Sequence, residues 1–144
     1  MRDGRYEDGF SLVEVLVAII LVGLAIASLV AANISFTKAN AAGTDLSTAE
    51  FPVEQVRERS ISVDYDDLNS LLHFDGVTFS PPINADGEYL TDFAAFSEQI
   101  IVENVSEQNF EQVVGYDSSF IRVSVKVFLN SKEISSAGWI RARY

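Results

Sequence analysis

The chain has 144 residues, a length that predicts one globular domain with an appendage and excludes a multi-domain enzyme. It carries 10 Lys and Arg residues against 21 Asp and Glu residues, and the net charge of -11 disfavours binding to nucleic-acid phosphates and anionic lipid head groups. Because the chain has no cysteine and one histidine, its composition excludes disulfides, cysteine nucleophiles and metal sites built from cysteine or from a histidine pair.

An apolar segment of 23 residues, from Phe10 to Ala32, contains a single ionisable side chain, Glu14. As a helix it would be roughly 35 Å long, enough to cross a hydrocarbon core of about 30 Å, so we predict a transmembrane helix over residues 10–32. The alternative, a cleaved secretory signal, normally has an apolar stretch of about 7–15 residues after a net positive region. Here two arginines precede the span against Lys38 shortly after it, which predicts a cytoplasmic N-terminus with the bulk of the chain outside.

Glu14 needs an explanation, because ionisable side chains within membrane spans are costly and are usually functional or paired. It lies four residues after Phe10, so its carboxylate could also stay near the membrane interface without any special role. From the span alone both interpretations remain open.

The residues around Glu14 form a motif, Gly9-Phe10-Ser11-Leu12-Val13-Glu14, followed by the uninterrupted apolar segment. This motif closely resembles the type III signal of type IV pilins and pseudopilins. The resemblance implies that a membrane prepilin peptidase cuts between Gly9 and Phe10, removes residues 1–9 as a leader and N-methylates Phe10. The acidic residue of the family falls on Glu14.

Some features depart from the pattern of the family. Many major pilins carry a glycine in mid-span, and Gly23 of this chain matches it. Many also carry a proline eight residues further on, and here this chain differs because it has Ala31. The leader is acidic, whereas family leaders commonly end in residues rich in Lys and Arg. The missing proline and the missing C-terminal cysteine pair favour a minor pilin or a pseudopilin over a major pilin.

Cleavage would create a terminal ammonium group on Phe10, at the positive end of the helix dipole, where a cation is unfavourable. Glu14 can offset this charge within its own chain, because positions i and i+4 are neighbours on a helix face. The family resemblance implies instead that Glu14 pairs with the terminal amine of an adjacent subunit, which would reward assembly away from water. The sequence does not separate these two pairings.

The helical pattern continues beyond Ala32 with a more polar character. Apolar or small residues recur at positions 42, 46, 49, 53 and 56, in steps of four and three, which is typical of an amphipathic helix with one buried stripe. Gly43 and Pro52 weaken a helix interior, so we expect a kink near residues 48 to 52. The predicted N-terminal helix covers residues 10–60.

Residues 61–144 have the pattern of a small head built from strands. The clearest strand is predicted over residues 121–129, where apolar residues alternate strictly on one face. The other expected elements are strands over 76–80, 98–105 and about 134–143, a hairpin loop over 130–132, and an exposed loop over 80–87. The predicted fold class is α+β, a long N-terminal helix packed on a small antiparallel sheet, and the family resemblance implies the same architecture.

Other polar groups favour structural roles over chemistry. The segment Asn84-Ala85-Asp86-Gly87-Glu88 suggests a calcium site involving Asp86, but it lacks the EF-hand spacing, so turn chemistry is preferred, as for the acidic run 64–67. His73 has no second histidine or cysteine to act with and is interpreted as a packing or surface residue. We expect residues 115–119 to form a turn and Trp139 to pack in the core or at a sheet edge. The sequence therefore predicts no catalytic residue, cofactor or metal.

The primary hypothesis is a type IV pilin-like structural subunit, a minor pilin or pseudopilin, and not an enzyme. The resemblance implies a single-pass precursor in the inner (cytoplasmic) membrane, with its head outside the cytoplasm, that assembles through its N-terminal helix into a pilus or a secretion pseudopilus such as that of type II secretion. Implied partners are other pilins or pseudopilins, the prepilin peptidase and, indirectly, an assembly platform protein and an ATPase; no nucleic-acid partner is predicted. The alternative is a non-polymerising single-pass membrane protein with an adhesive or ligand-binding head.

Overall fold

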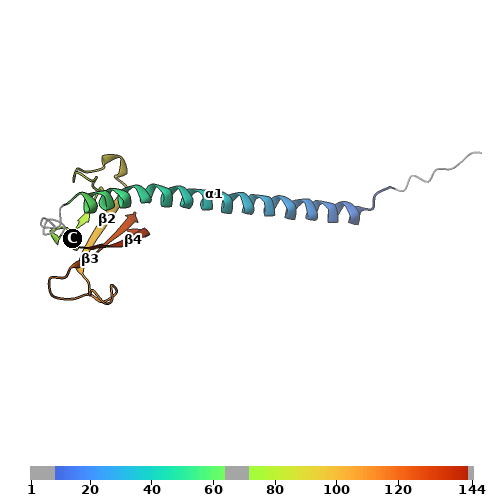
Figure 1. The fold of residues 1–144 in the computed structure, drawn as a ribbon. Helices are drawn as coiled ribbons and strands as arrows, with labels where there is room; N and C mark the ends of the chain where they lie inside the picture. Colours follow the sequence, from blue (N-terminus) through green and yellow to red (C-terminus); the bar gives the residue numbers. More distant parts are fainter. Residues whose placement is uncertain (1–8, 64–71, 143–144) are drawn as a thin grey trace, which may run out of the picture. The chain divides into compact units, whose positions relative to one another are not determined.

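The computed structural model describes residues 9–63 and 72–142 and contains one long helix and a four-stranded sheet (Figure 1). Contacts divide the chain into two compact units, residues 1–42 and 43–144, which are described separately below. The elements are α1 (Leu12–Ser62), β1 (Thr78–Phe79), the 3-10 turn η2 (Thr91–Phe93), β2 (Phe96–Asn104), β3 (Phe120–Leu129) and β4 (Lys132–Ala142). The predicted α+β class is confirmed, with a helix packed on an antiparallel sheet.

In the first unit, α1 is strongly apolar and its side chains are exposed. An 18-residue window of α1 near the N-terminus has a mean hydropathy of 3.0 and no buried residue. Among the described residues α1 is the one helix long and apolar enough to span a membrane by length and composition. Two of its hydroxyl groups are satisfied internally, because Ser28 donates to the carbonyl of Leu24 (2.8 Å) and Thr37 donates to that of Asn33 (2.9 Å). These two groups therefore need no partner outside the helix.

In the second unit, α1 continues through Pro52 without interruption, so this proline does not end the helix, and the kink expected near residues 48 to 52 stays a prediction. A proline in a helix interior costs about 3 kcal/mol through its missing N–H and its ring clash. Pro52 is fully buried in the head. Packing of this part of the helix in the core offsets that cost.

The sheet has the order β1-β2-β3-β4, and every neighbouring pair is antiparallel. The register of β2 on β3 runs from Phe96 opposite Leu129 to Asn104 opposite Ile121. The alternation predicted for residues 121–129 is confirmed, because the buried residues of β3 lie at every second position: Ile121, Val123, Val125 and Val127. The expected strand over 76–80 is shorter than predicted and is reduced to the two residues of β1.

A two-residue turn at Asn130 and Ser131 connects β3 to β4. Both residues have positive φ values, 50° and 67°, as the favoured two-residue hairpin turn requires. Lys132 was expected in the loop, but it is the first residue of β4 and pairs with Leu129. The tighter turn therefore lengthens the hairpin by one pair of residues.

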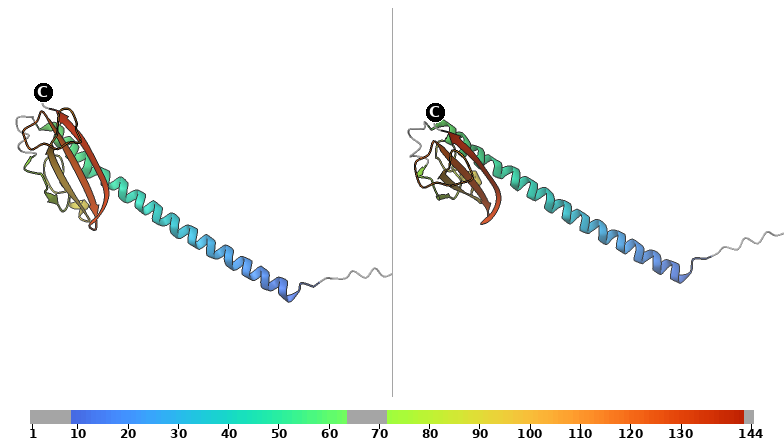
Figure 2. Two further views of the ribbon diagram at one scale, coloured as in Figure 1. Left: turned by 90° about the horizontal axis from the view of Figure 1, so that it is seen from below. Right: turned by 60° about the horizontal axis from the view of Figure 1, so that its bottom comes forward.

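The core of the head lies where residues 49–56 of α1 cross one face of the sheet (Figure 2). The buried apolar cluster joins the helix to β2, β3 and one loop residue, and partly buried residues of β4 pack against it: Ala49, Val53 and Val56 with Ile83, Ile100, Val102, Ile121, Val123, Val125 and Val127. The predicted stripe is correct from Ala49 onward. It is wrong for Ala42 and Leu46, which are exposed, because the buried core cluster includes no helix residue before Ala49.

The segment after β1 is not the exposed loop that we expected. Pro82 and Ile83 are fully buried, and Ile83 forms an antiparallel bridge with Tyr89. Two backbone bonds close the segment on itself, from Leu90 N–H to the carbonyl of Pro82 (2.7 Å) and from Asn84 N–H to that of Glu88 (2.8 Å). Only its tip is exposed, so residues 82–90 are part of the head; we call this segment the 82–90 loop.

Candidate functional site

The start of α1 is fixed by a local hydrogen-bond pattern at Ser11. The Ser11 hydroxyl accepts the N–H of Glu14 (3.2 Å), and the Ser11 carbonyl accepts the N–H groups of Glu14 (3.0 Å) and Val15 (3.2 Å). Ser11 is thus the N-cap, and the first helical residue is Leu12, two residues later than predicted. A serine followed three residues later by a glutamate has the spacing of a capping box, and this signal in the sequence would have placed the helix start correctly.

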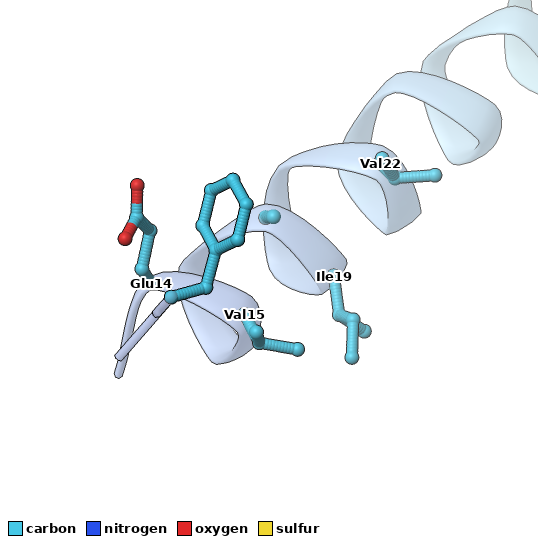
Figure 3. A pocket seen from close by; sticks show the side chains of 6 residues that line it. Glu14, Val15, Ile19 and Val22 are labelled. Atoms are coloured by element: carbon cyan, nitrogen blue, oxygen red, sulfur yellow. The ribbon is translucent and has the colours of Figure 1, made fainter. Parts of the chain in front are cut away.

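An open groove of about 540 Å³ runs along the first turns of α1 (Figure 3). Its lining residues follow helical spacing along one side of the helix: Phe10, Glu14, Val15, Ala18, Ile19 and Val22. The carboxylate of Glu14 projects from the first turn away from Val15 and Ile19 (Figure 3). The groove is therefore apolar along its length and carries one acidic group at its N-terminal end.

Glu14 is the only ionisable side chain between Gly9 and Ala32, and within the described residues it forms no ion pair. Its side chain is exposed, as are those of its apolar neighbours along the groove. A carboxylate offers only hydrogen-bond acceptors and negative charge. The arrangement can bind a cationic group next to an apolar helix. The other residues that line the groove have apolar side chains, so none of them could act together with Glu14 in catalysis.

The two residues of the expected cleavage site, Gly9 and Phe10, lie just before α1 in exposed, non-helical chain. Residues 1–8 of the expected leader lie outside the described residues. Gly23, expected to match the mid-span glycine, has nothing within 4 Å of the position where a Cβ would stand. Among the described residues no packing requires a glycine there, so a steric requirement would come from a neighbouring helix.

The expected turn chemistry at residues 84–88 is present. The side-chain oxygen of Asn84 accepts the N–H groups of Asp86 (3.0 Å) and Glu88 (2.8 Å), and its amide group donates to the carboxylate of Glu88 (3.3 Å). In the described part of the chain no three or more His, Asp or Glu side chains gather into a possible metal site. The acidic run 64–67 lies outside the described residues.

Trp139 and Ser118 have structural contacts. Trp139 is half-buried against the core, donates from its ring nitrogen to the Ser60 hydroxyl (2.9 Å) and lies under the guanidinium of Arg57 (5.9 Å to the ring centre). The Ser118 hydroxyl donates to the carbonyl of Val105 (2.6 Å) and fixes the segment over 115–119. His73 is exposed in a turn between α1 and β1.

One buried group was missed by the sequence reasoning. Glu98 sits at an inward position of β2, where its side chain is fully buried. The signal was present, since Glu98, Ile100 and Val102 alternate on one face of the strand. The acid at the first of these positions therefore shares the core face of β2 with Ile100 and Val102.

Comparison with known protein families finds a match to the prokaryotic N-terminal methylation motif over residues 4–31. The matched segment includes the Gly9–Phe10 bond, Glu14 and the whole lining of the groove. Searches of curated proteins and of solved structures give no significant match.

Proposed function

We propose that the chain is a minor pilin or pseudopilin that polymerises through α1. The proposal starts from this motif, which is the signal of type IV prepilins. The motif and the apolar helix indicate a membrane-anchored, type IV pilin-like precursor. The observation that carries the proposal is the motif itself, because it covers the processing site, the acidic residue and the groove together. In this proposal the role of the protein is structural and involves no catalysis.

Processing is proposed to occur at the Gly9–Phe10 bond. This bond lies in exposed chain two residues before the helix begins, so a peptidase at the membrane surface can reach it without unwinding α1. Cleavage would leave Phe10 as the new N-terminus, with Ser11 still in place as the cap of the helix. Methylation would then modify the amine of Phe10.

Assembly is proposed to use the groove and Glu14. The large apolar side chains between Leu12 and Phe36 are exposed, and in a membrane their neighbours are lipid chains. Exchanging lipid for the helices of other subunits gains little from the hydrophobic effect, so close packing and polar pairing must supply the specificity. An amine on Phe10 of an incoming subunit would give Glu14 a partner, and an unpaired charge in the low-dielectric core would disfavour the unassembled state.

The proposed location follows from the same segment. The precursor spans the inner membrane once, its head lies outside the cytoplasm, and the processed chain joins a pilus or pseudopilus. Its direct partners would be other pilins or pseudopilins and the prepilin peptidase, with an assembly platform and an ATPase acting on the filament. The minor role is supported by Ala31 in place of a proline and by the absence of cysteine.

Replacement of Glu14 tests the assembly step. We expect Glu14→Ala to lower incorporation into filaments in the native host by about tenfold or more, because loss of one partner of an ion pair away from water costs more than about 1.4 kcal/mol. Incorporation is measured as the ratio of chain in sheared filaments to chain in membranes. The matched control is Glu58→Ala, which removes an exposed carboxylate from the head end of the same helix.

Intact mass spectrometry of the same samples separates processing from assembly. Loss of residues 1–9 with the gain of one methyl group is expected for both variants and for the unaltered chain. An unaltered chain that keeps its first nine residues in cells with an active peptidase would refute the processing step. A processed Glu14→Ala chain that enters filaments normally would refute the assembly step, and a processed unaltered chain that remains only in membranes would favour the non-polymerising alternative.

A further inference from the structure

Glu98 is a carboxylic acid inside an apolar core. Its side chain is 0% exposed and projects from the same face of β2 as Ile100 and Val102. Its cross-strand neighbours are Phe79 on β1 and Val127 on β3. A carboxyl group at this position has lost nearly all contact with water.

The two oxygens of Glu98 differ in their contacts. Oε1 accepts the N–H of Ile83 in the 82–90 loop (2.8 Å). Oε2 is buried and has no hydrogen-bond partner among the described residues. An ionised carboxylate with one hydrogen bond in such surroundings is very unfavourable, whereas the neutral acid leaves only one polar group unsatisfied.

No other charged group is placed to offset a negative charge on Glu98 within the described residues. On β3, Arg122 pairs with Glu103 and Lys126 pairs with Glu133. Both cations lie opposite outward-facing residues of β2 and β4. On the neighbouring helix and loop, six charged side chains and the titratable side chain of Tyr89 are exposed. The six are those of Glu50, Glu54, Arg57, Glu58, Asp86 and Glu88. The remaining cation of this helix segment and loop, Arg59, donates to the carbonyl of Ala85 (2.9 Å) and lies over the ring of Phe74. On β4, Lys132 is exposed and Arg141 donates to the carbonyl of Val63.

Burial therefore raises the pKa of Glu98 from its ordinary value of 4.5 to about 7, and the hydrogen bond from Ile83 acts in the opposite direction. Glu98 belongs to a set of three side chains that hold the 82–90 loop. The other two contacts are from Ala85 N–H to the side-chain oxygen of Gln55 (3.1 Å) and from Arg59 to the Ala85 carbonyl. Of the three, only Glu98 changes its charge near neutral pH.

We propose that Glu98 is a pH-operated latch, whose protonated carboxyl holds the 82–90 loop on the sheet and whose ionised form favours a state in which the loop has moved away and water reaches Oε2. Because Leu90 and Asn84 close the loop on itself, it can move as one unit while its own backbone bonds persist. The proposal concerns the head alone and does not depend on polymerisation.

The direction of the pH effect follows from linkage. The closed state keeps its proton up to about pH 7, whereas the open state exposes Glu98 to water and releases the proton near pH 4.5. Raising the pH between these values therefore favours opening, by about tenfold for each unit. Below the lower value and above the higher one, the two states bind equal numbers of protons and the equilibrium no longer changes.

Hydrogen exchange of the full chain in detergent micelles tests the latch. The measured quantity is the protection factor, which is the intrinsic exchange rate divided by the observed rate, for the amides of Ile83 and Ala85. We expect it to fall by about 40-fold between pH 5 and pH 7, because both ends of this range lie close to one of the two pKa values, and to level off above about pH 8. At each pH the amides of β3 should be better protected, because the loop opens without unfolding of the sheet.

Two variants complete the test. Glu98→Gln keeps an oxygen to accept the Ile83 N–H but cannot ionise, so its loop protection should not change with pH. Glu103→Gln alters a carboxylate on the other face of the same strand and should keep the full pH dependence. If Glu98→Gln does not fold, the pH series of the unaltered chain decides. Loop protection that is constant with pH, or equal to that of β3 throughout, would overturn the proposal.

Discussion

Single side chains set the chemistry of the two described units, and in both the outcome depends on whether a polar group has a partner. Ser11 gives the first turn of α1 a hydrogen-bonded start and so fixes the place from which Glu14 projects. Glu98 has one satisfied oxygen and one without a described partner in the core of the head. The exposed acid and the buried acid are thus suited to different tasks, one to meeting a partner and the other to sensing protons.

Ser131 gives a test at the scale of one residue. Its φ of 67° is unfavourable for a residue with a Cβ, and glycine removes that cost, so we expect Ser131→Gly to stabilise the head by about 1 kcal/mol. The free energy of unfolding can be measured by urea titration with the fluorescence of Trp139, the single tryptophan of the chain. The control is Ser136→Gly within β4, where added backbone freedom should destabilise. A loss of stability for Ser131→Gly would contradict the assigned turn.

At the scale of elements, α1 changes its environment along its length. Its apolar side chains are exposed in the first unit, whereas from Ala49 onward one stripe is buried in the core of the head. The sequence pattern predicted the correct buried positions from Ala49 onward, but it placed the start of the stripe too early, at Ala42. Periodicity shows which residues share a face of a helix, and it carries no information on where the covering sheet begins.

The start of the buried stripe can be checked with two truncations on the same helix. Val53 is 2% exposed, and Val53→Ala should destabilise the head by about 2 kcal/mol through lost burial and a cavity. Leu46 is 47% exposed, and Leu46→Ala should change stability by less than about 0.5 kcal/mol although it removes more atoms. Urea unfolding measures both. An equal cost for the two variants would place the start of the core earlier than Ala49.

The sheet shows what local pattern can and cannot predict. β3 was predicted nearly to its ends because its inward-facing residues from Ile121 to Val127 recur at every second position. β1 and the 82–90 loop were misjudged, since their burial depends on contacts with residues that are distant in sequence, including Gln55, Arg59 and Glu98. Proline and glycine in this segment correctly indicated turns, but turn residues do not reveal whether a turn is packed.

At the scale of the whole molecule, the chain consists of two units with different requirements. The N-terminal unit could be interpreted from the sequence because its motif is contiguous and needs no tertiary contact to be recognised. The groove along it follows from the same residues once they are helical. For the head, composition and alternation predicted the class of fold, whereas the position of its titratable core residue required the structure.

The division into units predicts that the head folds alone. A chain that starts at Gly43 keeps the helix residues that form the core, so it should unfold cooperatively in urea with a free energy within about 1 kcal/mol of that of the full chain in detergent. Circular dichroism and Trp139 fluorescence should give coincident transitions. A chain that starts at Pro52 lacks Ala49 and the helical turn before it, and we expect it to be clearly less stable. Failure of the Gly43 chain to fold would show that the first unit supports the head.

The hydroxyl groups of Ser28 and Thr37 donate to carbonyls of their own helix, so these two groups need no acceptor outside the helix. In the proposed assembly step, passage from bilayer to filament would break neither of these two bonds; it would exchange weak contacts between apolar side chains and would add the pair between Glu14 and an amine. Such a step is reversible in principle. A subunit withdrawn from a filament could return to the lipid undamaged and be used again.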